Sequence, residues 1–186
     1  MKKLDDFNAK DRVELKLLEN SVHFLSGEIS EENVNEAIKW LIYENLEHKT
    51  TKTLTLYINS PGGDLYEAFA LIDVMRNSHH YIRTIGVGQI MSAAFLIFAS
   101  GTKGERYIGQ NTGIMCHQLS DSQEGKYHDI KAQAKEADLC NTRMLDILKE
   151  ATGLAPSKIK SKLLPASDIY MTATEMVDFN VADHII

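Results

Sequence analysis

Hydrophobic positions along the chain follow two alternating periods, and the first third shows both. A helical period of apolar residues follows Ser30, a suitable N-cap, and extends to Leu46. Residues 53–58 then alternate between polar and apolar, as a half-buried strand does. A Ser-Pro-Gly-Gly turn at 60–63 separates this strand from a second apolar-faced helix, which Asp64 can cap. The pattern predicts a unit of strand, turn and helix.

The same unit repeats in the middle of the chain. β-branched residues at 81–87 predict a strand, Gly88 and Gln89 predict a turn, and the apolar run 90–99 predicts a buried helix that Gly101 ends. That run is about half the roughly 20 residues that a membrane-spanning helix needs. Alternating strands and helices predict an α/β fold built in layers.

The second half is dominated by one long helical pattern. Short strands are expected near 106–108 and 113–117, a helix from about 128–152, a short helix at Pro156, and a last helix opened by the capping box 172–175. The long helix exceeds what a compact domain usually holds. Its apolar stripe therefore needs a partner, and it comprises Ile130, Ala134, Ala137, Met144, Leu145 and Leu148.

Composition narrows the class of protein. The 186 residues are 44% hydrophobic and carry 26 acidic against 20 basic side chains, a net charge of −6. Without repeats or linkers, residues 1–186 are expected to form one domain. The scattered acidic charge predicts no nucleic-acid partner and no membrane partner. Cys116 and Cys140 stand far apart without metal-ligand spacing, and no secretory signal is evident, so we expect a cytoplasmic protein.

Two turns carry candidate chemistry. The glycines at 62–63 let backbone amides approach a ligand closely, and such amides can hold an oxyanion. Ser92 lies in or beside the first turn of an apolar helix, where free amides and the helix dipole favour negative charge. Taken alone, each feature has a simpler interpretation, an ordinary turn in the first case and a capping or buried serine in the second.

A nucleophilic serine needs a base, and the base needs a carboxylate. Among seven histidines, His117 ends a strand-like segment, and α/β folds place their sites at strand ends. His79 and His80 are adjacent and lack a ligand pattern, so we expect them to be solvated loop residues. No nucleotide-binding motif is complete.

As a set, four motifs resemble the ClpP family of serine proteases. Residues 60–63 resemble the family's SPGG, and 88–93 (GQIMSA) its GQxxS nucleophile segment. Residues 115–118 (MCHQ) resemble its MxHQ base segment, and 168–173 (DIYMTA) its acid segment. The order and spacing agree, over about residues 17–186.

The resemblance implies a site and its chemistry. Ser92 would be the nucleophile, His117 the general base and then acid, and Asp168 the orienting carboxylate. The amides of Gly63 and Ala93 would form the oxyanion hole. The implied function is endopeptidase cleavage of unfolded polypeptides through an acyl-enzyme, with no cofactor and no metal.

The resemblance also implies an architecture. The fold would be a ClpP/crotonase-like spiral of ββα units, with an N-terminal axial segment (1–16) and a protruding handle helix and strand (about 119–153). The chain would assemble into stacked rings, as heptameric pairs forming a tetradecamer, and an AAA+ unfoldase ATPase would be its partner.

The sequence departs from the family at positions that, in other members, couple contacts between ring subunits to the geometry of the site or align the substrate. Leu119 stands where proline is usual, and Gly113, Ala166 and Ser167 stand where charged residues elsewhere tie ring contact to the site. We therefore expect activity to depend less on assembly than is usual. Two alternatives stay open: a ring subunit with a structural or regulatory role, and a crotonase-like enzyme acting on acyl thioesters.

Overall fold

The computed structural model describes residues 8–120 and 124–186, and over these residues seven strands form one mixed sheet. Five strands lie parallel in the order β1-β2-β3-β4-β7. β5 adds to β3 in parallel, and β6 pairs with β5 antiparallel. The strands are β1 (Val22–Ser26), β2 (Thr53–Ser60), β3 (Tyr81–Met91), β4 (Arg106–Ile108), β5 (Gly113–Cys116), β6 (Ile169–Met171) and β7 (His184–Ile185).

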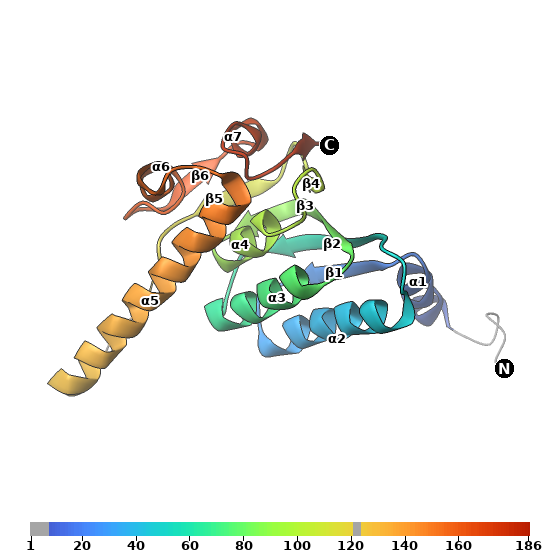
Figure 1. Cartoon of the computed structure of the whole chain (residues 1–186), viewed down its shortest axis with the longest axis horizontal. Coiled ribbons are helices and arrows are strands. Elements are labelled where there is room, and N and C mark those ends of the chain that lie inside the picture. Colours follow the sequence, from blue (N-terminus) through green and yellow to red (C-terminus); the bar gives the residue numbers. More distant parts are fainter. Residues whose placement is uncertain (1–7, 121–123) are drawn as a thin grey trace.

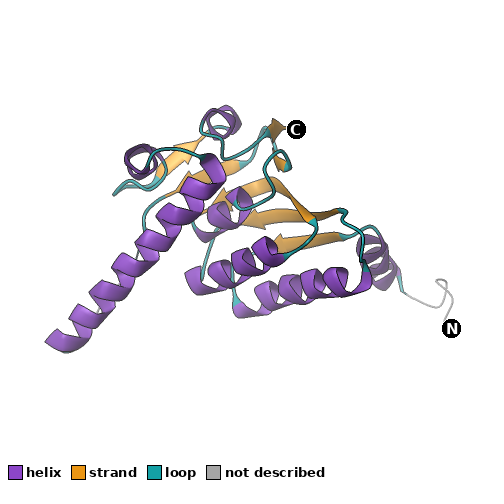
Figure 2. Cartoon of the chain, in the orientation of Figure 1, coloured by secondary structure: helices purple, strands orange, loops and turns teal. Residues whose placement is uncertain are grey.

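Helices cover the sheet and connect its strands (Figures 1 and 2). They are α1 (Ala9–Glu19), α2 (Glu31–Glu47), α3 (Leu65–Asn77), α4 (Ala93–Ala99), α5 (Tyr127–Thr152), α6 (Pro156–Lys162) and α7 (Ala173–Asp178). α2 and α3 lie side by side along one face, with α4 beside α3. The predicted α/β architecture is confirmed, whereas α1, β1 and β6 were not foreseen. No helix in the described part of the chain is long and apolar enough to cross a membrane.

Local sequence explains where the predicted helices begin. Ser30 and Asn33 form a reciprocal capping box at the start of α2, and Asp64 accepts hydrogen bonds from two backbone amides at the start of α3. Thr172 and Glu175 form the capping box predicted for α7. Gly153, with a φ of 70°, ends α5 in the left-handed conformation that glycine adopts without a steric penalty. These boundaries agree with the sequence predictions.

β3 is longer than predicted, and the prediction of a turn at Gly88 and Gln89 is wrong. The strand continues to Met91, so α4 begins at Ala93 rather than at Ile90. β3 changes partner along its length: residues 84–86 pair with β4, and residues 89–91 pair with β5. Gly88, with a φ of 67°, makes the bend between the two halves. The Asn59 side chain accepts a hydrogen bond from the Gln89 amide at 3.1 Å.

α5 extends beyond the body of the molecule (Figure 1). All residues from 127 to 135 are exposed, and the helix reaches the core only in its second half. Met144 and Leu148 belong to this second half and are buried in the chain's own core. The predicted long helix is confirmed, but the interpretation of these two residues as part of an unpartnered stripe is wrong.

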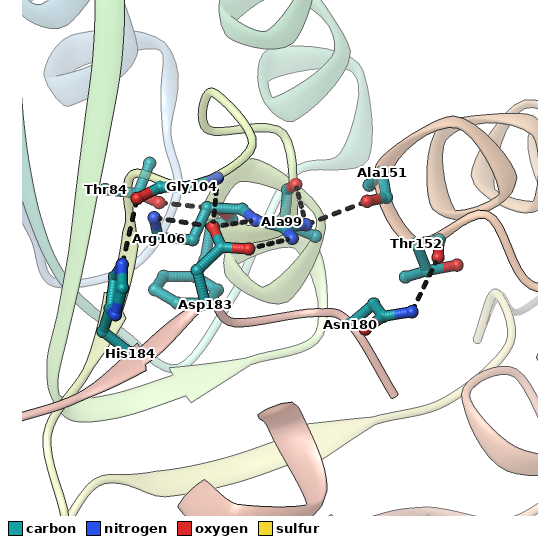
Figure 3. A network of polar contacts seen from close by, with 10 residues as sticks. Thr84, Ala99, Gly104, Arg106, Ala151, Thr152, Asn180, Asp183 and His184 are labelled. Carbon is teal, nitrogen blue, oxygen red and sulfur yellow. Dashed lines mark hydrogen bonds and ion pairs between the residues drawn. The ribbon is translucent and has the colours of Figure 1, made fainter. Parts of the chain in front are cut away.

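A buried arginine ties the C-terminal segment to the core (Figure 3). The Arg106 side chain, 1% exposed, donates to both carboxylate oxygens of Asp183, at 2.7 and 2.8 Å. It also donates to the carbonyls of Ala99 and Ala151, in the last turns of α4 and α5. Although burial alone would raise it, the hydrogen bonds and charge of Arg106 lower the pKa of Asp183. The contacts hold the ends of α4 and α5 in fixed positions.

The expectation of two solvated histidines is wrong for His80. His79 is exposed, but His80 is 5% exposed and its two ring nitrogens both have backbone partners. Its Nδ1 accepts from the Lys52 amide, and its Nε2 lies 3.2 Å from the Glu44 carbonyl oxygen. The buried ring, which directly precedes β3, therefore joins the last turn of α2 to the residue before β2.

Candidate active site

The sheet topology brings three distant segments to one place. β3 ends just before Ser92, and β5, its parallel neighbour, ends just before His117. β6 is antiparallel to β5, with Ile169 opposite Cys116. The register therefore places Asp168 opposite His117. A serine, a histidine and an aspartate that are up to 76 residues apart in the sequence therefore meet at one end of the sheet.

Ser92 lies at the junction of β3 and α4 in a strained backbone conformation. Its φ of 52° and ψ of −122° are rare for a residue with a Cβ, and such conformations cost about 1–3 kcal/mol. A hydrogen bond from its amide to the Met115 carbonyl, at 3.0 Å, holds the junction against β5. The sharp change of direction presents the side chain above the first turn of α4, where backbone amides are free of helical partners.

The serine and histidine side chains are within hydrogen-bond distance. His117 Nε2 lies 2.7 Å from Ser92 Oγ, and His117 is only 18% exposed. This is the distance that a general base needs to take a hydroxyl proton. The third contact is looser, because 3.8 Å separates His117 Nδ1 from Asp168 Oδ1 and the Asp168 side chain is 55% exposed.

The glycine turn packs directly against the serine. A Cβ on Gly62 would lie 2.7 Å from the Ser92 Cβ, so only glycine allows this approach. Ile29 fixes the turn on both sides, because its amide donates to the Gly62 carbonyl and its carbonyl accepts from the Asp64 amide. Gly63 and Ala93 thereby line the same hollow as Ser92 and His117.

That hollow is small, with a volume of about 60 Å³. Beyond the residues already described, its walls come from α3, from the segment after His117 and from α5: Leu65, Gln118, Leu119, Ser120 and Met144. An acyl group attached to Ser92 would have to enter this hollow, because it is the space that adjoins the Ser92 hydroxyl and the two amides. Two larger hollows elsewhere contain neither Ser92 nor His117.

The neighbouring cysteine is not a competing nucleophile. Cys116 is 1% exposed, and its side chain belongs to the hydrophobic core. Burial raises the pKa of its thiol to about 12, so the reactive thiolate is negligible near neutral pH. Serine, rather than thiol, chemistry is what this arrangement supports.

Sequence reasoning named the five central residues but missed those that position them. Ile29 holds the glycine turn, Asn59 holds the bend of β3, and Asn141 of α5 accepts a hydrogen bond from the Leu119 amide. The sequence carries no local signal for these contacts, because each joins segments that are more than 20 residues apart. Of the three, only Asn59 lies next to a motif, because it directly precedes the Ser-Pro-Gly-Gly turn.

Comparison with known proteins agrees with the motifs. Residues 7–186 match the Clp protease family. The chain is also 33% identical, over 181 residues, to the ATP-dependent Clp protease proteolytic subunit 1 of Leifsonia xyli subsp. xyli (strain CTCB07). That alignment covers 97% of this chain and 90% of the relative.

Proposed function

Because this chain belongs to the Clp protease family, we propose that it cleaves unfolded polypeptides as a serine endopeptidase with a triad of Ser92, His117 and Asp168. The observation that carries the assignment is the 2.7 Å contact between Ser92 Oγ and His117 Nε2. Family membership favours peptide substrates over the acyl thioesters of the crotonase-like alternative.

The proposed reaction follows from the positions of these groups. Ser92 Oγ attacks the scissile carbonyl carbon while its proton passes to His117 Nε2. The carbonyl oxygen becomes an oxyanion that accepts hydrogen bonds from the Gly63 and Ala93 amides. The C–N bond then breaks, and His117 returns the proton to the leaving amine. Water, activated by His117, attacks the acyl-enzyme and releases Ser92 and the carboxylic acid.

Asp168 is proposed to stabilise the imidazolium and fix its tautomer, although its contact is long. Catalytic hydrogen bonds are often long before substrate binds, and the exposed Asp168 is free to move closer. The same long contact supports the second candidate, a ring subunit with a structural or regulatory role and low activity of its own. The labelling experiment below separates the two.

The remaining parts of the proposal concern assembly and location. Residues 127–135 of α5 are all exposed, and the related subunit is named as part of an ATP-dependent protease. These observations support assembly into stacked heptameric rings and work with an AAA+ unfoldase ATPase. We propose a cytoplasmic location, because Cys116 and Cys140 are both free thiols, as is usual in a reducing compartment.

An active-site-directed fluorophosphonate tests the proposal. The wild-type chain should be labelled on Ser92, because the reagent needs an activated hydroxyl. Ser92→Ala should lose labelling and lower peptide turnover by several orders of magnitude. Ser100→Ala is the matched control at the other end of α4, where the hydroxyl donates to the Leu96 carbonyl. Wild-type protein that is folded but not labelled would support the structural subunit instead, and labelling retained in Ser92→Ala would refute the nucleophile.

A further inference from the structure

Two hydrogen bonds restrain the segment that follows His117. The Gln118 amide donates to the Pro165 carbonyl at 3.3 Å. The Leu119 amide donates to Asn141 Oδ1 at 3.0 Å, and this second bond joins the segment to α5. Both partners are distant in sequence, so the segment depends on contacts made by the rest of the fold.

This segment is a wall of the hollow beside Ser92. Gln118, Leu119 and Ser120 line it on one side, and Met144 lines it from α5. Asn141 and Met144 are three residues apart on one helix, so they share a helical face. The face of α5 that closes the hollow is therefore the face that holds its wall in place.

The backbone at Leu119 needs such a restraint. Compared with proline, leucine leaves φ free and adds an N–H group, and a partly buried N–H without a partner destabilises the folded chain. The Asn141 side chain accepts the hydrogen bond from this N–H group and thereby also restrains the direction of the chain at Leu119. A proline at 119 would achieve the same result differently, with φ locked and no N–H to satisfy.

We propose that Asn141 is a positioning residue that holds the 118–120 segment as the wall against which the substrate binds. The inference rests on the proposed peptidase function, and it concerns the grip on a peptide rather than the chemistry of Ser92. It also gives α5 a role in the site that is separate from any role in assembly.

Peptidase kinetics with a short fluorogenic peptide test the proposal on the full chain. Asn141→Ala and the bulkier Asn141→Leu both remove the acceptor, and each should raise KM about tenfold while kcat changes by less than about threefold. Asn141→Asp keeps an oxygen acceptor at the same place and should restore KM to within about twofold of the wild-type value. Thr142→Ala, an exposed neighbour on α5, is the matched control and should leave KM unchanged.

A double-mutant cycle tests whether Asn141 acts through its hydrogen bond with the Leu119 amide. In a Leu119→Pro background the N–H is absent, so Asn141→Ala should raise KM by less than about twofold. A tenfold effect that persists in that background, an unchanged KM in both acceptor-free variants, or an Asn141→Asp variant as impaired as Asn141→Ala would overturn the proposal.

Fluorophosphonate labelling keeps the two hypotheses apart. The reagent carries no peptide, so its rate of reaction with Ser92 should be the same in Asn141→Ala and in the wild type. A loss of labelling confined to the Asn141 variants would overturn the positioning role, because it would place the effect on the triad. A wild-type chain that is not labelled would refute the proposed function itself.

Discussion

At the scale of single residues, His117 and Asp168 are expected to contribute unequally. His117→Ala removes the proposed base from its 2.7 Å contact with Ser92 and should lower kcat by several orders of magnitude. Asp168→Asn leaves the His117 imidazole in the wrong tautomer, a change that lowers kcat by up to about 10⁴-fold in serine proteases. Because Asp168 is exposed and lies 3.8 Å from His117, its substitution should lower kcat less than His117→Ala does. Turnover of a short peptide measures both. The exposed His79→Ala is the control, and near-normal turnover of Asp168→Asn would require another carboxylate.

Two histidines, His80 buried and His23 half-buried, make stability sensitive to mild acid. Burial lowers the pKa of His23, which stacks on Trp40, and the pKa of His80. Below the ordinary imidazole value, near 6.5, the unfolded chain therefore binds protons that the native chain does not. The free energy of unfolding should keep its full value above about pH 6.5 and fall as the pH drops further.

Thermal melts between about pH 7.5 and about pH 5.5 check this direction, and Tm should fall toward the acid end. The charged groups around His80 are Glu44, Lys52 and His79. His80→Gln should have a lower Tm at the neutral end and a shallower dependence on pH, since one of the two titrating rings is gone. A wild-type Tm that is constant across this range would contradict the prediction.

His80 shows why the environment of a residue outside any motif is hard to predict from sequence. Ser92 and His117 stand in motifs from which the resemblance implies a role, and the two side chains lie within hydrogen-bond distance of each other. His80 has no motif, and its environment is made by the Glu44 carbonyl and the Lys52 amide, which are 36 and 28 residues away. Burial of this kind is a property of the folded chain and leaves no local pattern.

At the scale of elements, the bend of β3 is expected to control the position of Ser92. A Cβ on Gly88 would lie 2.5 Å from Asn59 Oδ1, the atom that accepts the Gln89 amide. Gly88→Ala should therefore displace the end of β3 and lower kcat at least about tenfold, beyond the roughly 1–3 kcal/mol of backbone strain. Gly104→Ala is the matched control, because Gly104 also has a positive φ but no atom within 4 Å of an added Cβ.

Peptide turnover and Tm of the two glycine variants separate strain from displacement. Both variants should lower Tm, because both force alanine into a positive φ, and only Gly88→Ala should lower kcat. Equal losses of activity in the two variants would show that the Asn59 contact does not position Ser92.

The elements that sequence predicted well are those with local signals. α2, α3 and α7 have capping residues, and α5 has a glycine at its end, so their boundaries follow from nearby side chains. β3 was predicted to stop at Gly88 because glycine after a β-branched run is typical of a turn. The strand continues because β5, more than 20 residues downstream, pairs with residues 89–91. No local sequence pattern indicates this second pairing.

At the scale of the whole molecule, the protruding half of α5 is expected to hold an assembly together. Burial of Met144 and Leu148 moves the contact surface away from these residues, toward Ile130 and Leu139, which are 39% and 43% exposed. A charge at either exposed position would be desolvated in a subunit contact without an ion partner, which costs several kcal/mol per site. Ile130→Glu and Leu139→Glu should therefore release smaller species while each chain stays folded.

Light scattering and native mass spectrometry measure the outcome at micromolar concentration. The wild type should be a large closed oligomer, and the two charged variants should have lower mass with an unchanged far-UV spectrum. Gly113, Ala166 and Ser167 cannot form ion pairs, so the loss of assembly should lower fluorophosphonate labelling of Ser92 only modestly. A wild-type chain that is a stable monomer would refute the role of α5 in assembly. Smaller species that lose labelling completely would show that the triad is completed only by ring contacts, and the 3.8 Å separation of His117 and Asp168 would then describe the unassembled state.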